Sequence, residues 1–176
     1  MADTSHLAHI AEDLITHHLQ RSGLLVAKPK NDRLGTDLLV FDQIADGVKF
    51  CRVQCKGRTV SRRGAKITIP EQHVTAGYLL LAYLTTGADE GCLYLFLPTV
   101  VQTWPKSAKG VYTLNVGRDY ESKLKPWKFG PHHVQQIKHI IQQAEAVGEF
   151  KFVVFGTAYL SLPMFSLEST GHQSDK

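Results

Sequence analysis

The sequence predicts one α/β domain, and three features indicate this class. Residues 6–21 repeat apolar side chains at the spacing of one helical face. Two apolar runs of strand length, 37–41 and 49–56, flank an Asp46-Gly47 turn that favours a hairpin. Residues 91–97 form a continuous apolar run, as expected for a strand buried on both faces. With 176 residues, the chain is long enough for one domain with its own core.

The first predicted element is the helix over residues 6–21. Its apolar stripe consists of Leu7, Ile10, Ala11, Leu14 and His18. Glu12 lies at the edge of that stripe. Its carboxylate can therefore reach past the core boundary or remain an ordinary exposed helix glutamate.

Three strands follow, over residues 24–27, 37–41 and 49–56. Because side chains alternate along a strand, one face of the third strand carries Phe50, Arg52, Gln54 and Lys56. The other face carries Cys51, Val53 and Cys55. A carboxylate at Asp37, an amide oxygen and an ammonium could thus form a divalent-metal site with a cation beside it.

The remaining elements build the scaffold. They are a strand over 66–69, a helix over 70–84, the apolar strand 91–97, an edge strand over 111–116, a helix over 132–147 and a strand over 151–155. The helix over 70–84 is indicated by Val74, Tyr78, Leu81 and Ala82 at helical spacing. Residues 168–176 are polar and predict a disordered tail after a single domain over residues 1–167.

The motif order resembles the PD-(D/E)xK nuclease superfamily, also called the restriction-endonuclease-like fold. The resemblance rests on a helix with Ala11-Glu12, a strand opened by Gly35-Thr36-Asp37, and a hairpin leading to Gln54-Cys55-Lys56. It covers residues 6–60, about a third of the chain. The resemblance implies a mixed central β-sheet flanked by helices on both faces.

The resemblance also implies roles for individual residues. Asp37 and Gln54 would be metal ligands together with the Cys55 carbonyl, Lys56 the catalytic lysine, and Glu12 a helix-borne acid that binds Mg²⁺ (or Mn²⁺) directly or through water. Two positions depart from the family pattern: Thr36 replaces proline, and Gln54 replaces an acid. The amide oxygen can coordinate a hard cation but brings no charge, so metal affinity should fall.

Basic residues cluster on both sides of these motifs in a chain of net charge +4. The candidates for phosphate contacts are Lys30, Arg33, Arg58, Arg62, Arg63 and Lys66, and Lys28 lies beside them. The alternative is a solvated basic loop. The expected partner is DNA, with RNA not excluded.

The sequence gives little support to other classes of protein or of functional site. No transmembrane run or secretory signal is present, which predicts a cytosolic protein, and Cys51 and Cys55 read as buried free thiols. The histidine pairs lack zinc-site spacing, and no phosphate-binding loop is present. Aromatic residues among lysines could stack bases or form a packing surface: Trp104, Tyr112, Tyr120, Trp127 and Phe129.

The sequence therefore favours a metal-dependent DNA endonuclease. Helices after the lysine strand run near the active site in such folds, so Gln72 and His73 are candidates to touch substrate. One site per chain would favour a homodimer for cutting both strands. The alternatives are a non-catalytic nucleic-acid-binding or structural subunit with the same fold, and an interaction protein with no nucleic-acid role.

Overall fold

The computed structural model describes residues 4–30, 35–44, 47–87, 91–144, 152–154 and 157–159. The N-terminal half contains α1 (Thr4–Arg21), β1 (Leu25–Ala27), β2 (Leu38–Ile44), β3 (Gly47–Thr59), β4 (Ala65–Pro70), η1 (Glu71–His73) and β5 (Tyr78–Thr85). The C-terminal half contains β6 (Cys92–Phe96), α2 (Pro98–Val101), β7 (Val111–Val116), α3 (Tyr120–Lys123), η2 (Lys125–Trp127), α4 (Pro131–Gln143), β8 (Phe152–Val154) and β9 (Thr157–Tyr159).

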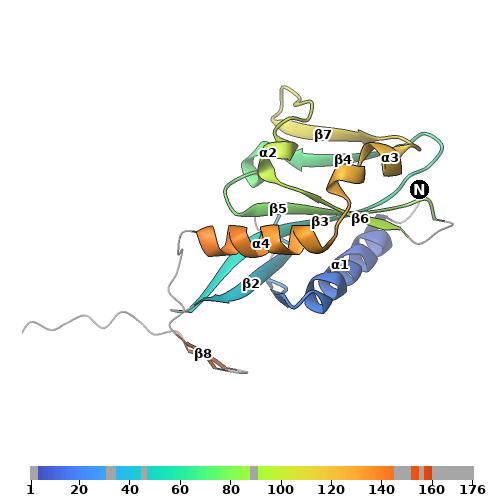
Figure 1. The fold of residues 1–176 in the computed structure, drawn as a ribbon. Helices are drawn as coiled ribbons and strands as arrows, with labels where there is room; N and C mark the ends of the chain where they lie inside the picture. Colours follow the sequence, from blue (N-terminus) through green and yellow to red (C-terminus); the bar gives the residue numbers. More distant parts are fainter. Residues whose placement is uncertain are drawn as a thin grey trace, which may run out of the picture.

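A mixed five-stranded sheet forms the centre, in the order β1-β2-β3-β5-β6 (Figure 1). Strands β3 and β5 are parallel, and the other neighbours are antiparallel. Strands β2 and β3 form an antiparallel pair that ends with Ile44 opposite Gly47, and Asp46 of the predicted Asp46-Gly47 turn lies outside the described residues. The predicted α/β class with a mixed central sheet and flanking helices is confirmed.

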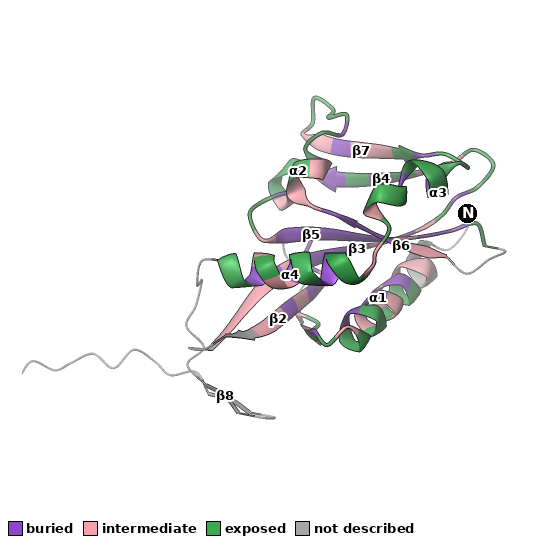
Figure 2. Ribbon diagram, viewed as in Figure 1, coloured by how far each residue is buried: buried purple, intermediate pink, exposed green. Residues whose placement is uncertain are grey.

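The two faces of this sheet are covered differently (Figures 1 and 2). Helices α1 and α4 cover one face, with Ile15, Leu19 and Ile137 buried against β3 residues that include Val53. The other face is covered by α2, α3 and a two-stranded antiparallel ribbon of β4 and β7. The alternation predicted for β3 is thus observed, because Cys51, Val53 and Cys55 belong to the α1 face.

Helix α1 buries a slightly different stripe from the predicted one. Ala11, Ile15 and Leu19 are fully buried, whereas Ile10 and His18 are exposed. The helix lies very close to β3 at Gly57, where an added Cβ would come within 2.7 Å of the Leu7 carbonyl oxygen. The buried stripe thus follows the i, i+4, i+8 positions, and the close approach at Gly57 requires glycine on the strand.

The helix predicted over residues 70–84 is wrong. Only Glu71–His73 is helical, as a single 3-10 turn, and Tyr78–Thr85 is strand β5 at the centre of the sheet. Gly77, directly before the strand, has a left-handed backbone conformation with a φ of +70°, which a helix does not allow. A continuous apolar run fits both the helical and the strand spacing of apolar residues, so its pattern does not distinguish the two. Burial on both faces of the sheet favours the strand.

Several smaller predictions can be compared with the described residues. Cys51 and Cys55 are buried free thiols, as expected. Trp104, Tyr112 and Tyr120 are buried in the core beneath the β4–β7 ribbon, so the packing interpretation holds for these aromatics. The predicted strands 91–97 and 111–116 are β6 and β7, and the predicted strand 151–155 contains β8, which pairs with β9.

The C-terminal part of the predicted domain and its tail lie largely outside the described residues, which end at residue 159. Helix α4 ends at Gln143 rather than at residue 147. No helix among the described residues is long and apolar enough to cross a membrane.

Replacing His133 with glutamine will make the folded state less sensitive to acid. The His133 Nδ1 accepts a hydrogen bond from the Gly130 N–H at the start of α4, at 3.2 Å. Burial lowers the pKa of His133 below its ordinary value of 6.5, and the adjacent His132 adds to this. As the pH falls, the histidine is therefore protonated in the unfolded chain before it is protonated in the folded one. The free energy of unfolding decreases as the pH falls below about 6.5.

Glutamine keeps an acceptor for the Gly130 N–H but does not titrate. Thermal unfolding between pH 7.5 and 5.5 should therefore show a smaller loss for His133→Gln than for the wild type. The control is His139→Gln, an exposed position on the same helix. Equal pH slopes in wild type and His133→Gln would contradict this account.

Candidate active site

Asp37 directly precedes β2, beside a part of β3 that extends beyond the last residue paired with β2. The first paired residue of β2 is Leu38, opposite Val53, and the Asp37 N–H donates to the Val53 carbonyl at 3.0 Å. Among the described residues, no strand pairs with β3 on this side after Val53. The Asp37 carboxylate occupies the gap, and its Oδ2 accepts a hydrogen bond from the Cys55 N–H at 2.6 Å. In a strand the N–H and C=O of one residue point to the same side, so the Cys55 carbonyl is directed at the same edge.

Gln54 is buried on the opposite face of β3 from Cys55, with 4% of its surface exposed. Its Oε1 accepts a hydrogen bond from the Tyr78 hydroxyl at 2.8 Å. Burial raises the pKa of Tyr78, and the charge of Asp37 raises it further. The tyrosine therefore remains a neutral donor, and both Gln54 and Asp37 lie near its hydroxyl.

Gly35 and His73 complete the surroundings of the Gln54 amide. Gly35 has a φ of +66°, and a Cβ added there would lie 2.5 Å from Gln54 Nε2 and 2.3 Å from His73 Nδ1. His73 comes from the 3-10 turn after β4. It therefore reaches the candidate site, although not from the helix that the sequence predicted, whereas Gln72 is exposed on the same turn.

Gly35→Ala should damage both folding and the site. The new methyl group meets His73 and the Gln54 amide, and the left-handed backbone adds strain. We expect a loss of about 2 kcal/mol or more in the free energy of unfolding, measured by denaturant titration, because overpacking alone costs 1–3 kcal/mol. Any activity that depends on Gln54 should fall with it.

The matched control is Gly23→Ala. Gly23 has a similar φ of +78°, but nothing lies within 4 Å of an added Cβ. It should therefore show the backbone strain alone, about 1 kcal/mol. Equal losses at the two positions would refute the close packing at Gly35.

Glu12 forms an ion pair that the sequence did not predict. Its Oε2 is bonded to the Lys28 ammonium, and 17% of its side chain is exposed. The hydrogen bond from Lys28 to Glu12 raises the pKa of the lysine. Nothing in the spacing of the two residues could have indicated this contact, because α1 and the segment after β1 meet only in the folded chain.

Lys56 is half-buried on the same face of β3 as Gln54. No hydrogen bond or ion pair joins it to another described residue. Burial raises the pKa of the Cys55 thiol most, and the charges of Asp37 and Glu12 raise it further. Lys56 and Lys28 lower the same pKa. The Cys55 thiol packs on the α1 face of β3, whereas Gln54 and Lys56 lie on the other face.

These donors are compatible with a hard divalent cation. The Asp37 carboxylate, the Gln54 amide oxygen and the Cys55 carbonyl all offer oxygen ligands. Asp37 Oδ2 and Gln54 Oε1 each have a second lone pair beyond the hydrogen bond that they accept. No group of three or more His, Cys, Asp or Glu side chains in the described ranges is arranged to hold a metal. A site here would therefore depend on the amide and on the backbone.

The predicted phosphate-binding residues separate into groups. Arg58 donates from Nε to the Lys66 carbonyl at 2.9 Å and from Nη1 to the Gly57 carbonyl at 2.7 Å. It thus connects β3 with β4, and burial lowers its pKa. Lys30 is exposed, and Arg33 lies outside the described residues.

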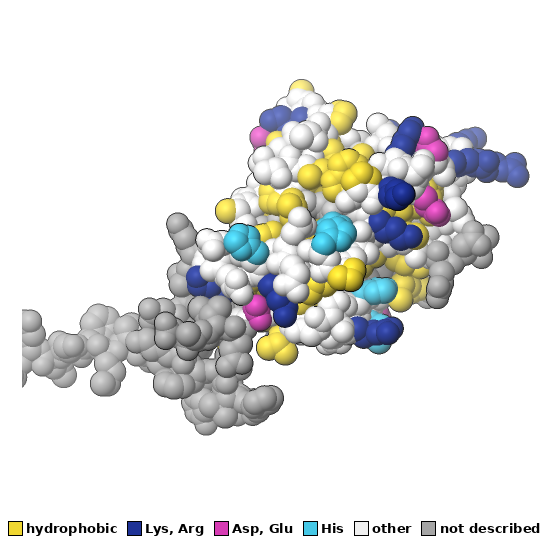
Figure 3. All heavy atoms as spheres, in the orientation of Figure 1, with side chains coloured by type: hydrophobic (Ala, Val, Ile, Leu, Met, Phe, Trp, Pro, Cys, Tyr) yellow, Lys and Arg dark blue, Asp and Glu magenta, His cyan; other side chains and the backbone are white. Residues whose placement is uncertain are grey.

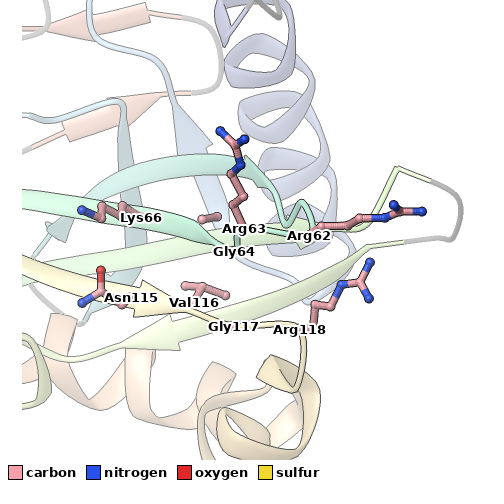
Figure 4. Close-up of a pocket in the computed structure, with 9 residues that line it drawn as sticks. Arg62, Arg63, Gly64, Lys66, Asn115, Val116, Gly117 and Arg118 are labelled. Carbon is pink, nitrogen blue, oxygen red and sulfur yellow. The ribbon is translucent and has the colours of Figure 1, made fainter.

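Arg62, Arg63 and Lys66 line one open pocket where β4 begins and β7 ends (Figure 4). The pocket also includes Arg118, which the sequence did not indicate because it follows β7, about fifty residues away. Basic side chains gather beside α3 and these strand ends in the surface view (Figure 3). The fold thus lines one pocket with four basic residues, of which Arg62 and Arg118 extend in a similar direction.

Comparison with solved structures finds a similar fold. The chain superposes on I-Ssp6803I, a bacterial homing endonuclease, with a TM-score of 0.55 and 18% sequence identity. The match covers 80% of this chain and 98% of that one. At this identity the likeness establishes the fold alone. No protein-family model matches the sequence, and a comparison with curated proteins also finds no match.

Proposed function

We propose that this protein is a divalent-metal-dependent DNA endonuclease of the PD-(D/E)xK superfamily. The observation that carries the proposal is the position of Asp37. Its carboxylate is bonded to the Cys55 N–H, at the edge of β3 between Gln54 and Lys56. The fold similarity to a homing endonuclease supports DNA as the substrate.

Asp37, the Gln54 amide oxygen and the Cys55 carbonyl would hold Mg²⁺ or Mn²⁺. A bound divalent ion supplies polarisation of the scissile phosphate and a lower pKa for an attacking water. The Cys55 N–H keeps the Asp37 carboxylate oriented, and the Tyr78 hydroxyl does the same for the Gln54 amide. These contacts would hold the two proposed oxygen ligands in position before substrate arrives.

Lys56 would stabilise the charge that develops on the phosphate. Its ammonium has no described partner to release, and its half-buried position strengthens its effect on a nearby anion. Glu12 would act only after exchanging Lys28 for the metal or a metal-bound water, because its carboxylate is already ion-paired.

The non-catalytic alternative also has a specific observation in its favour. Each predicted acid or amide already has a partner within the protein: Glu12 with Lys28, Asp37 with the Cys55 N–H, and Gln54 with Tyr78. Such satisfied contacts are what a fold that has lost catalysis would also retain. The same fold would then serve as a nucleic-acid-binding or structural subunit.

Cleavage by the purified full-length protein separates the two. Duplex, single-stranded and branched DNA would be incubated with Mg²⁺ or Mn²⁺, and with EDTA as the blank. Nicks or breaks that appear only with the metal support the nuclease. DNA binding without cleavage of any of these substrates supports the binding subunit.

We also propose that the enzyme cuts duplex DNA as a homodimer, because each chain would supply one site. Light scattering with and without a DNA duplex measures this. A monomer on DNA that still cuts both strands would overturn the proposal.

A further inference from the structure

The β4–β7 ribbon has two different faces. Its inner face is buried against the central sheet and includes Ile67 and Ile69. Its outer face is polar: Lys66 lies opposite Asn115, and Thr68 lies opposite Thr113. Lys66, Thr68 and Asn115 are exposed, and Thr113 is half-buried. Four hydrogen-bonding side chains therefore occupy one surface of two paired strands.

The dimensions of this ribbon suit a groove of B-form DNA. The major groove is about 12 Å wide and admits a two-stranded antiparallel ribbon. Residues 105–107 are hydrogen-bonded to β7 along Val111–Thr113, so that half of the ribbon is wider than one strand pair. Over the other half, which carries Lys66 and Asn115, β4 and β7 pair only with each other among the described residues. Six residues at about 3.3 Å each give roughly 20 Å, the length of five or six base pairs.

The chemistry of the outer face suits base edges. Lysine reads guanine, asparagine makes paired hydrogen bonds to adenine, and threonine serves as donor, acceptor or contact for the thymine methyl group. Arg62, Arg63 and Arg118 extend from the end of the ribbon, Arg62 and Arg118 in a similar direction (Figure 4). This arrangement places phosphate-binding cations beside potential base-reading groups.

Two acids beside the ribbon are paired with lysines. Glu71 is paired with Lys106, and Asp119 with Lys123, each at 2.8 Å. Neither carboxylate is among the residues that line the arginine pocket. The outer end of the ribbon therefore presents its positive charge to a polyanion.

Arg58 fixes the ribbon to the strand that carries the candidate site. Its guanidinium joins the Gly57 carbonyl of β3 to the Lys66 carbonyl of β4. Gly57 directly follows Lys56. A half-buried side chain thus links the strand that carries Lys56 to the strand that carries Lys66.

From these features we propose that the outer face of the β4–β7 ribbon enters the major groove of duplex DNA and selects the sequence. Lys66 and Asn115 read base edges, with Thr68 and Thr113 beside them. Arg62, Arg63 and Arg118 bind flanking phosphates. This assignment rests on DNA being the substrate in the proposed function, but it requires neither a metal nor cleavage.

The test is a selection of bound sites from a random duplex library by the full-length protein in EDTA. Affinities for the selected site and for its scrambled version then give a preference ratio. Lys66→Ala and Asn115→Ala should each lower that ratio by roughly 5- to 100-fold. Arg62→Ala and Arg118→Ala should weaken both duplexes equally and flatten the salt dependence by about 0.9 log unit per contact.

Matched controls are Lys138→Ala and Gln135→Ala on α4, which covers the opposite face of the sheet. They should leave the ratio unchanged. Because the major groove of A-form RNA is too narrow for such readout, an RNA duplex of the selected sequence should compete no better than scrambled DNA. Thermal melting checks that all variants fold.

Three results would overturn the assignment: a library that yields no preferred sequence, a ratio unaffected by Lys66→Ala and Asn115→Ala, or equal competition by the RNA duplex. Metal-dependent cleavage with an unchanged ratio would remove the ribbon proposal and leave the nuclease. If Lys66→Ala and Asn115→Ala lower the preference ratio as expected but the protein never cleaves DNA, the ribbon proposal stands and the nuclease proposal is removed.

Discussion

Asp37→Asn will reduce metal-dependent cleavage by at least about 100-fold while DNA binding is retained. Asparagine preserves the shape and can still accept the Cys55 N–H hydrogen bond, so the strand edge should remain intact. It removes the only acid among the three proposed oxygen ligands. The rate at saturating Mg²⁺ and the affinity for DNA in EDTA measure the two effects separately.

Lys56→Met should cause a similar loss, about 100- to 1000-fold, because one charge that stabilises the transition state is removed. Methionine keeps most of the aliphatic stem at this half-buried position. The Mg²⁺ requirement should change little, which distinguishes the lysine from the ligands.

Glu121→Gln, which removes an exposed carboxylate on α3, is the control for both variants. It should cleave at the wild-type rate. Full activity in Asp37→Asn or in Lys56→Met would contradict the roles proposed for them.

Gln54→Glu should lower the Mg²⁺ concentration for half-maximal cleavage by about 10-fold. The substitution keeps the oxygen that accepts from Tyr78 and adds a negative charge beside the proposed cation. A tenfold change is about 1.4 kcal/mol, well within the roughly 4 kcal/mol of two unit charges 4 Å apart at an effective dielectric constant of 20. Part of that energy is lost because a buried carboxylate resists ionisation.

The maximal rate need not rise with this affinity. Lys56 shares the face of β3 with position 54, so its ammonium would be drawn toward the new carboxylate and away from the phosphate. A Mg²⁺ titration of cleavage gives both quantities. The control is Gln136→Glu, an exposed position on α4 that adds the same charge outside the proposed ligand set. An unchanged or higher Mg²⁺ requirement for Gln54→Glu would argue against Gln54 as a ligand.

The sequence predicted the parts of the fold that follow from local periodicity. Alternation along β3 placed Gln54 and Lys56 on one face and the two cysteines on the other, and the core clusters agree. Helix α1 was located to within two residues at its start. Such patterns depend only on which face of an element is buried.

It failed where several structures fit the same pattern or where contacts join distant segments. The apolar residues of Tyr78–Thr85 fit helical and strand spacing equally well. Only its place in the sheet between β3 and β6 makes this run a strand. The Glu12–Lys28 pair, the Tyr78 bond to Gln54 and the position of Arg118 all arise from tertiary packing. These are the features that refine the candidate site.

The location of the metal tests the central claim most directly. A crystal of the protein soaked in Mn²⁺ would be measured at the manganese absorption edge, where anomalous scattering identifies the ion. We predict one peak within coordination distance of the Asp37 carboxylate, the Gln54 amide oxygen and the Cys55 carbonyl. No peak at saturating Mn²⁺, or a peak that does not contact Asp37, would contradict the nuclease site proposed for this protein.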